Sequence, residues 1–265
     1  MKTKKLNGFA NVLLLSGLPT LMNISYALEA KHSHVAPKID GVMDTLWQAA
    51  PWQPLNQHIL GEMPSKEDFS GRFKVIWDEN KIYLLAEIQD DILFDSHPNP
   101  LDAYWDDDCL EIFIDEDRSG GEHQFNFNAF AYHIALDNQV VDIGYKTKDG
   151  QADFMLLNEH LTSAWRRQVN PPHKLIWEVA LDVYDDSFAY LTTQEGIKKF
   201  NDAKPVTLTA NKELGFMLAY CDNDGSESRE NFIGSVAIKP KNGDKNLGYK
   251  DAGVFAQLTL VEHLH

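Results

Sequence analysis

The sequence predicts an all-β fold, an antiparallel β-sandwich of the jelly-roll or immunoglobulin-like kind with one short helix and long loops. Three observations predict it. Short runs rich in β-branched and aromatic residues recur along the chain, polar turns separate them, and only residues 193–202 have a helical pattern. With 265 residues, 43% of them hydrophobic, the chain is long enough to bury a large core.

Residues 1–27 are expected to be a secretory signal peptide. Three lysines precede the apolar run 9–18, and Ser25-Tyr26-Ala27 places small residues where a signal peptidase cleaves. The apolar run is too short and too interrupted to span a membrane. We see no linker, repeat or shift in composition after it. We therefore expect an exported protein, periplasmic or secreted, in which residues 28–265 form one domain.

The clearest predicted strand pair is a hairpin, in which residues 73–77 lead through a polar turn into residues 82–88. In residues 175–183 every second side chain is apolar, which is typical of a strand with one buried face. Residues 146–172 are the least patterned and are expected to hold long loops. Other predicted strands are residues 109–115, 125–136, 215–221 and 255–261.

The acid-base balance of the chain limits its partners. The chain has 40 Asp and Glu against 24 Lys and Arg, a formal net charge of −16. Such a chain repels phosphate backbones, which argues against nucleic acid as a partner. Uncharged ligands and cations are compatible with this charge.

Acidic residues are concentrated between residues 88 and 124, which contain twelve Asp or Glu and a single Arg. Carboxylates packed this closely repel one another unless solvent or a cation screens them. Ca²⁺ binds about six to eight such hard oxygen ligands. We therefore expect bound Ca²⁺, with a solvated acidic surface as the alternative. The expected ligands are Asp90, Asp91, Asp108, Asp115, Asp117, Asp222 and Asp224.

Three other residues have identifiable roles. Trp105 lies in the acidic segment among polar residues, where its face could pack on a sugar ring; the alternative is that it folds back onto the core. Cys109 and Cys221 could form a disulfide if their strands are neighbours, or remain as two buried thiols. Trp47 follows a turn and begins a helical turn, which predicts a buried structural side chain.

Three segments, in order, resemble the family 9 carbohydrate-binding modules. They are Ile39-Asp40-Gly41 with Trp47, Trp77-Asp78-Glu79-Asn80 with Tyr83, and the run from Trp105 to Asp115. The resemblance extends from about residue 36 to residue 262. It implies a calcium-containing β-sandwich, often attached to xylanases, that clamps the terminal sugar of a glycan between two aromatic side chains.

The resemblance also implies a set of site residues. The first clamp tryptophan falls on Trp105 and the second near Tyr249, while a sugar-contacting arginine of the family falls on Asn126. If the strand at 109–115 extends back to Trp105, that side chain shares a sheet face with Glu111. The expected sugar-binding residues are Trp105, Glu111, Gln124, Asn126, Asn128 and Tyr249.

The function expected from these patterns is non-catalytic binding of the terminal sugar of a plant-type polysaccharide or oligosaccharide. A separately encoded glycoside hydrolase is the expected partner, and polysaccharide catabolism the expected process. Three alternatives stay open: a glycosidase using two of the many carboxylates, a haem b-binding sandwich, and a structural or assembly domain. The candidate haem ligands are Met217, His123 and His133.

Overall fold

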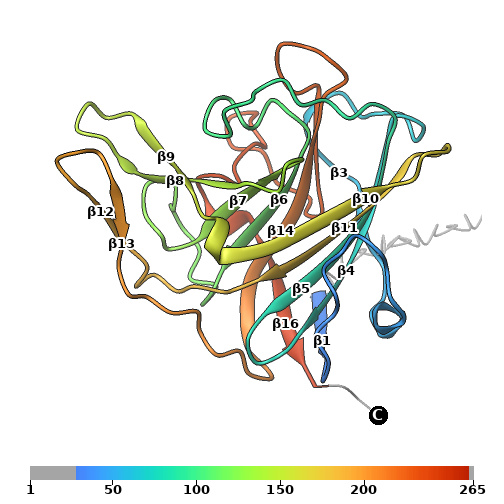
Figure 1. Ribbon diagram of the computed structural model, residues 1–265, viewed down its shortest axis with the longest axis horizontal. Helices are drawn as coiled ribbons and strands as arrows, with labels where there is room; N and C mark the ends of the chain where they lie inside the picture. Colours follow the sequence, from blue (N-terminus) through green and yellow to red (C-terminus); the bar gives the residue numbers. More distant parts are fainter. Residues whose placement is uncertain (1–27, 263–265) are drawn as a thin grey trace, which may run out of the picture.

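The computed structural model describes residues 28–262, so the expected signal peptide lies outside the described residues. This part is almost entirely β-structure, as predicted, with three short 3-10 helices (Figure 1). These are η1 (Thr45–Ala49), η2 (Asn158–His160) and η3 (Ala252–Val254). The strands are β1 (Leu28–His32), β2 (Gln53–Leu55), β3 (Gln57–Gly61), β4 (Phe69–Trp77), β5 (Ile82–Asp90), β6 (Cys109–Asp115), β7 (Phe130–Ala135), β8 (Val140–Lys146), β9 (Ala152–Leu156), β10 (Leu161–Arg167), β11 (Lys174–Leu181), β12 (Tyr190–Thr192), β13 (Lys198–Phe200), β14 (Glu213–Asp222), β15 (Asn231–Gly234) and β16 (Ala256–Val261).

Fourteen of these strands form one curled sheet, whose main path runs β10-β11-β5-β4-β1-β16-β14-β6-β7-β8-β9. The curl brings its two halves face to face, as in a sandwich (Figure 1). Aromatic contacts join the halves: Phe69 stacks on Tyr220 with ring centroids 5.4 Å apart, and Phe73 lies 6.0 Å from Phe216. The main apolar core therefore lies between β4 and β14 and extends along both halves.

Alternation along β6 separates two faces, as period-two geometry requires. Leu110, Ile112 and Ile114 belong to the main core. Cys109 and Phe113 belong to a second apolar cluster, which is built from β3, β14, β15 and the segment before β16. Glu111 lies on this second side of β6, away from the main core.

The sheet contains one departure from the antiparallel prediction. β1 pairs in parallel with both β4 and β16, and it closes the sheet between them. The remaining pairs of the main path are antiparallel. Because β1 and β16 come from opposite ends of the chain, no local sequence pattern could predict their pairing.

Two predicted segments are wrong. Residues 193–202 are no helix: Gly196, with φ of +81°, turns the chain so that β12 and β13 pair as a hairpin. Tyr190 and Phe200 pair across this hairpin, with rings 6.3 Å apart. The segment 146–172, expected to hold long loops, contains all of β9 and all of β10. β9 pairs with β8 and β10 pairs with β11, and these pairings form strands that the local sequence did not indicate.

The predicted strand 125–136 begins only at Phe130, because asparagine side chains bind the local backbone before it. Asn126 accepts through Oδ1 from the backbone N–H of Asn128, 2.9 Å away. Its amide Nδ2 donates to the carbonyl of Glu122 at 3.1 Å. Such bonds compete with a strand ladder and favour turns.

Trp47 is buried, as predicted, and the reason lies in β11. Its indole Nε1 donates to Glu178 Oε1 at 2.9 Å, while Oε2 of the same carboxylate accepts from the backbone N–H of Gly41. Gly41 has φ of +73°, and a Cβ there would lie 2.6 Å from backbone of the neighbouring β10. The Ile39-Asp40-Gly41 turn and Trp47 therefore form one structural unit. In the part of the chain that the structure describes, no helix is long and apolar enough to cross a membrane.

Candidate binding pocket and acidic cluster

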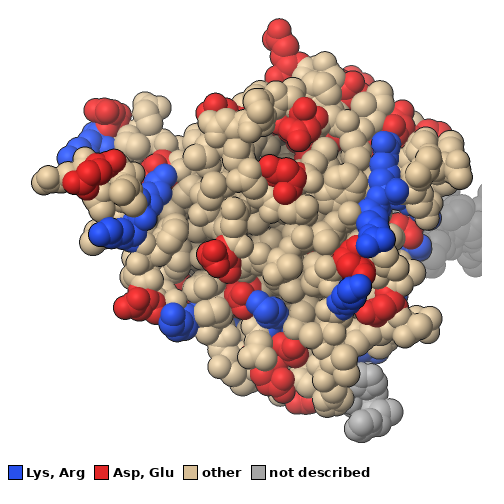
Figure 2. All heavy atoms as spheres, in the orientation of Figure 1, with Lys and Arg blue, Asp and Glu red and all other residues tan. Residues whose placement is uncertain are grey.

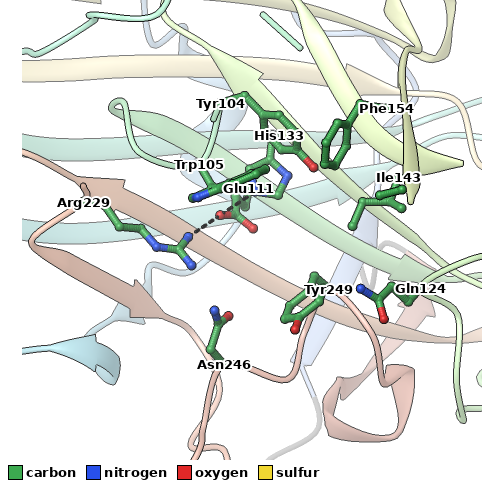
Figure 3. A pocket seen from close by; sticks show the side chains of 11 residues that line it. Tyr104, Trp105, Glu111, Gln124, His133, Ile143, Phe154, Arg229, Asn246 and Tyr249 are labelled. Atoms are coloured by element: carbon green, nitrogen blue, oxygen red, sulfur yellow. Dashed lines mark hydrogen bonds and ion pairs between the residues drawn. The ribbon is translucent and has the colours of Figure 1, made fainter. Parts of the chain in front are cut away.

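A pocket of about 310 Å³ opens over the second face of β6 and β7, beside β8 and β9 (Figure 3). Loops from distant parts of the sequence complete it. The residues that line it are Tyr104, Trp105, Glu111, Gln124, His133, Ile143, Ala152, Phe154, Arg229, Asn246 and Tyr249.

One wall of the pocket is aromatic. Trp105 lies 5.0 Å from the ring of Tyr104 and 5.7 Å from the ring of Phe154, and it belongs to neither apolar core. Tyr104 in turn contacts His133 edge-to-face at 4.5 Å. These contacts restrict the indole and leave part of it in the pocket lining, so Trp105 is not folded back onto the core.

The opposite side of the pocket carries Tyr249, Asn246 and Gln124 (Figure 3). Tyr249 is held by its neighbour Lys250, whose ammonium lies 4.9 Å from the ring centroid and donates to the phenol oxygen at 3.3 Å. Glu111 lies between the two sides in the view of Figure 3. The pocket thus has aromatic rings on two sides and polar groups on its floor.

The floor centres on the buried carboxylate of Glu111. Its Oε1 accepts from Arg229 Nη1 at 3.3 Å and from the Cys221 thiol at 2.9 Å, and it lies 2.9 Å from His133 Nε2. Burial opposes ionisation, but the charges and hydrogen bonds of His133 and Arg229 outweigh it and lower the pKa of Glu111. The carboxylate is therefore charged and fixed in place.

Arg229 and His133 are floor residues that were not expected in a sugar site from the sequence. His133 is the cross-strand partner of Glu111 in the β6–β7 register. Arg229 arrives on the loop between β14 and β15, where its backbone N–H donates to Asp106 and its guanidinium lies 4.4 Å from the ring of Phe232. A single arginine after the acidic turn at residues 222–227 is the signal that could have indicated it.

Asn126 and Asn128 lie outside the pocket, which corrects their expected place in the site. The Asn128 amide donates to the carbonyl of Gly120 at 2.8 Å, and Asn126 is bonded to the turn described above. Gln124 does line the pocket. The shared-face argument for Trp105 also fails, because β6 begins at Cys109 and Trp105 lies on the preceding loop.

Cys109 and Cys221 are cross-strand partners on β6 and β14, and both are buried free thiols. Burial and the contact between the two thiols raise the pKa of Cys109. Their strands are neighbours, as a disulfide would require, but the structure contains the two thiols instead.

A separate acidic cluster lies where one end of each of four strands meets. These are the ends of β5 and β14 and the starts of β4 and β6. Asp90, Asp108 and Asp222 form its buried inner group, with one carboxylate oxygen of each within 4.8 Å of the others. Asp68, Asp91 and Asp224 form a more exposed outer group of the same kind. Asp68 was not expected; it joins Asp91 because Phe69 pairs with Asp90 in the β4–β5 register.

Hydrogen bonds satisfy only some of these oxygens. Asp90 Oδ2 accepts from the Tyr220 hydroxyl at 2.6 Å, and Asp222 Oδ2 accepts from Asn231. The buried Oδ1 atoms of Asp68, Asp90, Asp222 and Asp224 have no partner within the described residues. Burial and mutual repulsion raise the pKa of Asp90 and of Asp222 to about 7. Unpartnered, mutually repelling hard oxygens fit a divalent cation such as Ca²⁺.

Asp115 and Asp117, also expected as metal ligands, lie at the other end of β6 from this cluster. Asp115 Oδ2 accepts from Gly120 N at 2.7 Å, and Asp117 Oδ1 accepts from Ser119 N at 2.9 Å. They close the turn after β6 instead of joining the other acids. Acidic and basic side chains are interspersed on the face in Figure 2, so no continuous acidic surface covers it.

The chain is similar to known carbohydrate-binding domains and to segments of xylanases. The family model described as carbohydrate family 9 binding domain-like matches residues 39–263. Endo-1,4-beta-xylanase A of Thermotoga maritima is 33% identical over 82 residues, which are 31% of this chain and 7% of the xylanase. Endo-1,4-beta-xylanase A of Thermotoga neapolitana is 28% identical over 97 residues, 37% of this chain and 9% of that enzyme. The matches thus span under a tenth of these relatives.

Among solved structures, a carbohydrate binding module of family 9 from Caldicellulosiruptor kristjanssonii, in complex with cellotriose, has a similar fold. Its TM-score is 0.60 at 16% sequence identity, and the alignment covers 89% of this chain and 94% of that one. This similarity supports the sandwich architecture independently of the sequence pattern.

Proposed function

The chain belongs to the carbohydrate family 9 binding domain-like family, and from this premise we propose that its pocket binds the terminal sugar of an oligosaccharide or polysaccharide without catalysing a reaction. The observation that carries the proposal is the arrangement of an aromatic wall around a buried, charge-paired carboxylate. The cellotriose complex of the structurally similar module supports it.

The aromatic sides fit a pyranose ring. Such a ring has two C–H faces, which pack on aromatic side chains, and hydroxyls around its rim, which require hydrogen-bonding partners. We propose that Trp105 and Tyr249 contact the two faces. The volume of about 310 Å³ is at the low end for small-molecule sites, which favours a terminal sugar over a longer segment of chain.

The polar floor fits the hydroxyls. Glu111 supplies an acceptor, Arg229 a donor, and Gln124 and Asn246 supply amides that can do either. The bonds of Glu111 to Arg229 and Cys221 hold its carboxylate in position before the ligand arrives. A preformed polar floor lowers the ordering cost of binding. Because the charges of Glu111 and Arg229 offset each other, we propose a neutral sugar as ligand.

The same geometry disfavours the catalytic and haem alternatives. A glycosidase needs two carboxyl groups near the scissile bond, one with a raised pKa. Among the residues that line this pocket, Glu111 is the single carboxylate, and its pKa is lowered. Of the candidate haem ligands, His123 is bonded to the carbonyl of Gly248 at 2.7 Å and Met217 is buried in the second apolar cluster.

We also propose that the acidic cluster binds Ca²⁺. Asp90, Asp108 and Asp222 would hold the ion, with Asp68, Asp91 and Asp224 around it. The ion would supply positive charge that offsets their repulsion. Asp108 Oδ1 accepts from the backbone N–H of Asn223, whose amide donates to the carbonyl of Asp106. The ion would therefore also steady the two loops that carry Trp105 and Arg229.

We also propose that the protein is exported and acts together with a glycoside hydrolase. The basic and apolar pattern of residues 1–27 supports export to the periplasm or the outside of the cell. The xylanases that this chain partly matches support a glycoside hydrolase as its partner in breaking down plant-type polysaccharide. The activity of those enzymes is not carried over, because the match spans so little of them.

Calorimetric titration with cello- and xylo-oligosaccharides, in the presence of Ca²⁺, tests the sugar site. We expect saturable binding of one ligand per chain, and loss of about 2–4 kcal/mol of binding free energy in Trp105→Ala. Trp52→Ala is the matched control, since Trp52 packs under Arg72 outside the pocket. Equal affinity of folded Trp105→Ala and parent protein would place the site elsewhere. No binding of any tested glycan would favour a structural or assembly role.

A further inference from the structure

Four potential metal ligands converge beneath the pocket from three adjacent strands. Cys221 on β14 pairs with Cys109 on β6, and Glu111 on β6 pairs with His133 on β7. All four side chains are buried. They include two sulfur atoms and one imidazole, so this group differs in kind from the oxygen-only acidic cluster.

The donor atoms are close together. Cys109 Sγ, a Glu111 carboxylate oxygen and a His133 ring nitrogen all lie within 4.8 Å of one another. Cys221 Sγ lies 2.9 Å from Glu111 Oε1. A tetrahedral zinc site with bonds of about 2.0–2.3 Å has edges of about 3.3–3.8 Å. Small side-chain movements would bring the donor atoms of Cys109, Glu111 and His133 to these distances, and Cys221 Sγ adjoins the group through Glu111.

His133 is oriented as a metal ligand would be. Its Nδ1 lies 3.3 Å from the carbonyl oxygen of Ala131, an acceptor that requires a proton on Nδ1. Nε2 then faces Glu111 Oε1 at 2.9 Å. Either a proton on Nε2, which gives the charge that stabilises the Glu111 carboxylate, or a cation must lie between the two atoms. A backbone carbonyl on one ring nitrogen, with the other turned to a shared centre, is the usual support of a metal-bound histidine.

The strand geometry keeps the two cysteines as separate thiols. Leu218 exchanges hydrogen bonds with Ser235, so its peptide groups face β15. Because these groups alternate along a strand, those of Cys221 face β6, and Cys221 and Cys109 form a hydrogen-bonded pair. Such pairs hold their side chains farther apart than non-hydrogen-bonded pairs, whereas a disulfide needs Cβ atoms about 3.5–4.5 Å apart.

We propose that Cys109, Cys221, Glu111 and His133 bind a borderline-soft divalent cation such as Zn²⁺ under the sugar pocket. On binding, each thiol releases one proton, and two thiolates, one carboxylate and the ion carry a net charge of −1. Arg229, 3.0 Å from Cys221 Sγ and 3.3 Å from Glu111 Oε1, offsets that charge. Glu111 and His133 line the pocket, which provides the route of entry.

The site goes beyond sugar binding and does not depend on it. The metal uses one oxygen of Glu111, and the other oxygen remains for a ligand in the pocket. Ca²⁺, which prefers hard oxygen ligands, does not compete for a site with two sulfurs. An experiment can therefore distinguish the two metal sites by the ion that it uses.

Cobalt(II) titration of the full-length protein, kept reduced with a phosphine, tests the proposal. Co²⁺ bound by thiolates absorbs strongly in the near ultraviolet, and tetrahedral Co²⁺ absorbs in the visible. We expect both bands to saturate at one Co²⁺ per chain, to disappear on addition of Zn²⁺ and to persist in excess Ca²⁺. Cys221→Ala and Cys109→Ala should lose the thiolate band, and Glu111→Gln should weaken Zn²⁺ binding by at least about 10-fold, the smallest loss typical of a residue that only supports a ligand.

His34→Ala is the matched control, because His34 is exposed and its ring contacts His32 on β1, outside this group of ligands. It should keep both bands, and thermal melts identify the variants that fold. Absence of the thiolate band in the parent protein would overturn the proposal. So would its persistence in both cysteine variants, or a Cys109–Cys221 disulfide found by mass spectrometry in protein purified without reductant. Sugar affinity is measured separately, so these outcomes leave the sugar proposal unaffected.

Discussion

At the scale of single residues, Glu111 is the centre of the pocket floor. It is buried on β6, yet an arginine, a histidine and a thiol all face one of its oxygens. A buried carboxylate is destabilising unless its partners compensate for lost water. The cost of this charge therefore depends on residues from two other strands and one loop.

Removing one partner of the buried pair should be strongly destabilising. We expect Arg229→Met to lower the free energy of unfolding by about 3–5 kcal/mol, because it removes one of the two cationic partners of the buried Glu111 carboxylate. Adding Glu111→Gln to it should recover part of the loss. Urea denaturation of the parent, both single variants and the double variant measures the coupling. Strictly additive effects would contradict a direct interaction between the two side chains.

His160 should make stability depend on pH. It lies 2.8 Å from the Tyr132 hydroxyl and stacks on Tyr184, and burial lowers its pKa to about 4. The unfolded chain has a histidine pKa near 6.5 and binds more protons between these values, so stability falls as pH decreases from about 6.5 to 4.

The difference between the folded and unfolded pKa values of His160 corresponds to about 2–4 kcal/mol of unfolding free energy. We expect His160→Gln to lose less stability than the parent across this pH range in urea denaturation. His58→Gln, a change on β3 away from this cluster, should behave as the parent. An identical pH dependence of parent and His160→Gln would show that other groups dominate.

At the scale of elements, the contact between β3 and β15 positions the loop that carries Arg229. Gly61 ends β3 with φ of +80°, and a Cβ there would lie 1.8 Å from the carbonyl oxygen of Glu230. Glu230 directly follows Arg229 in the chain. A side chain at residue 61 would therefore displace the backbone beside a pocket residue.

We expect Gly61→Ala to destabilise the protein by more than the roughly 1–3 kcal/mol of left-handed strain alone, and to weaken sugar binding. Gly150→Ala is the matched control, with φ of +79° and no atom within 4 Å of the added Cβ. It should show the strain without the clash and without loss of binding. Thermal melts and sugar titrations of both variants make the comparison; equal effects would contradict the proposed support of Arg229.

At the scale of the whole molecule, the acidic cluster joins the ends of strands from both halves of the sandwich. β4 and β5 belong to one half, and β6 and β14 belong to the other. A cation bound there links the halves only in the folded state, because the unfolded chain does not bring these acids together. Its effect is therefore on global stability.

We expect Ca²⁺ at about 100 times its dissociation constant to add about 2.7 kcal/mol, or roughly 5–11 °C in melting temperature. Asp90→Asn should abolish this dependence, whereas Asp117→Asn, in the exposed turn after β6, should keep it. Melts with Ca²⁺ and with EDTA make the test. Coincident curves for the parent at saturating Ca²⁺ would contradict a stabilising ion.

Local residue patterns were enough to predict most of the strands, because period-two alternation and polar turns are properties of short segments. β6 begins and ends as predicted, and the hairpin of β4 and β5 was visible in its turn. The density of acids and the polar surroundings of Trp105 were equally visible. The helix predicted at 193–202 failed because a glycine turn and cross-strand aromatic pairing outweighed a short helical pattern.

Which polar groups lie together depends on how distant segments pack in the folded chain. Strand registers placed Asp68 beside Asp91, Cys109 opposite Cys221 and Glu111 opposite His133. The loop between β14 and β15 brought Arg229 to a carboxylate 118 residues away in sequence. Asn126 and Asn128 do not line the pocket, because their side-chain amides donate to the backbone carbonyls of Glu122 and Gly120. Such pairings depend on contacts between distant segments, and local residue patterns contain no information about them.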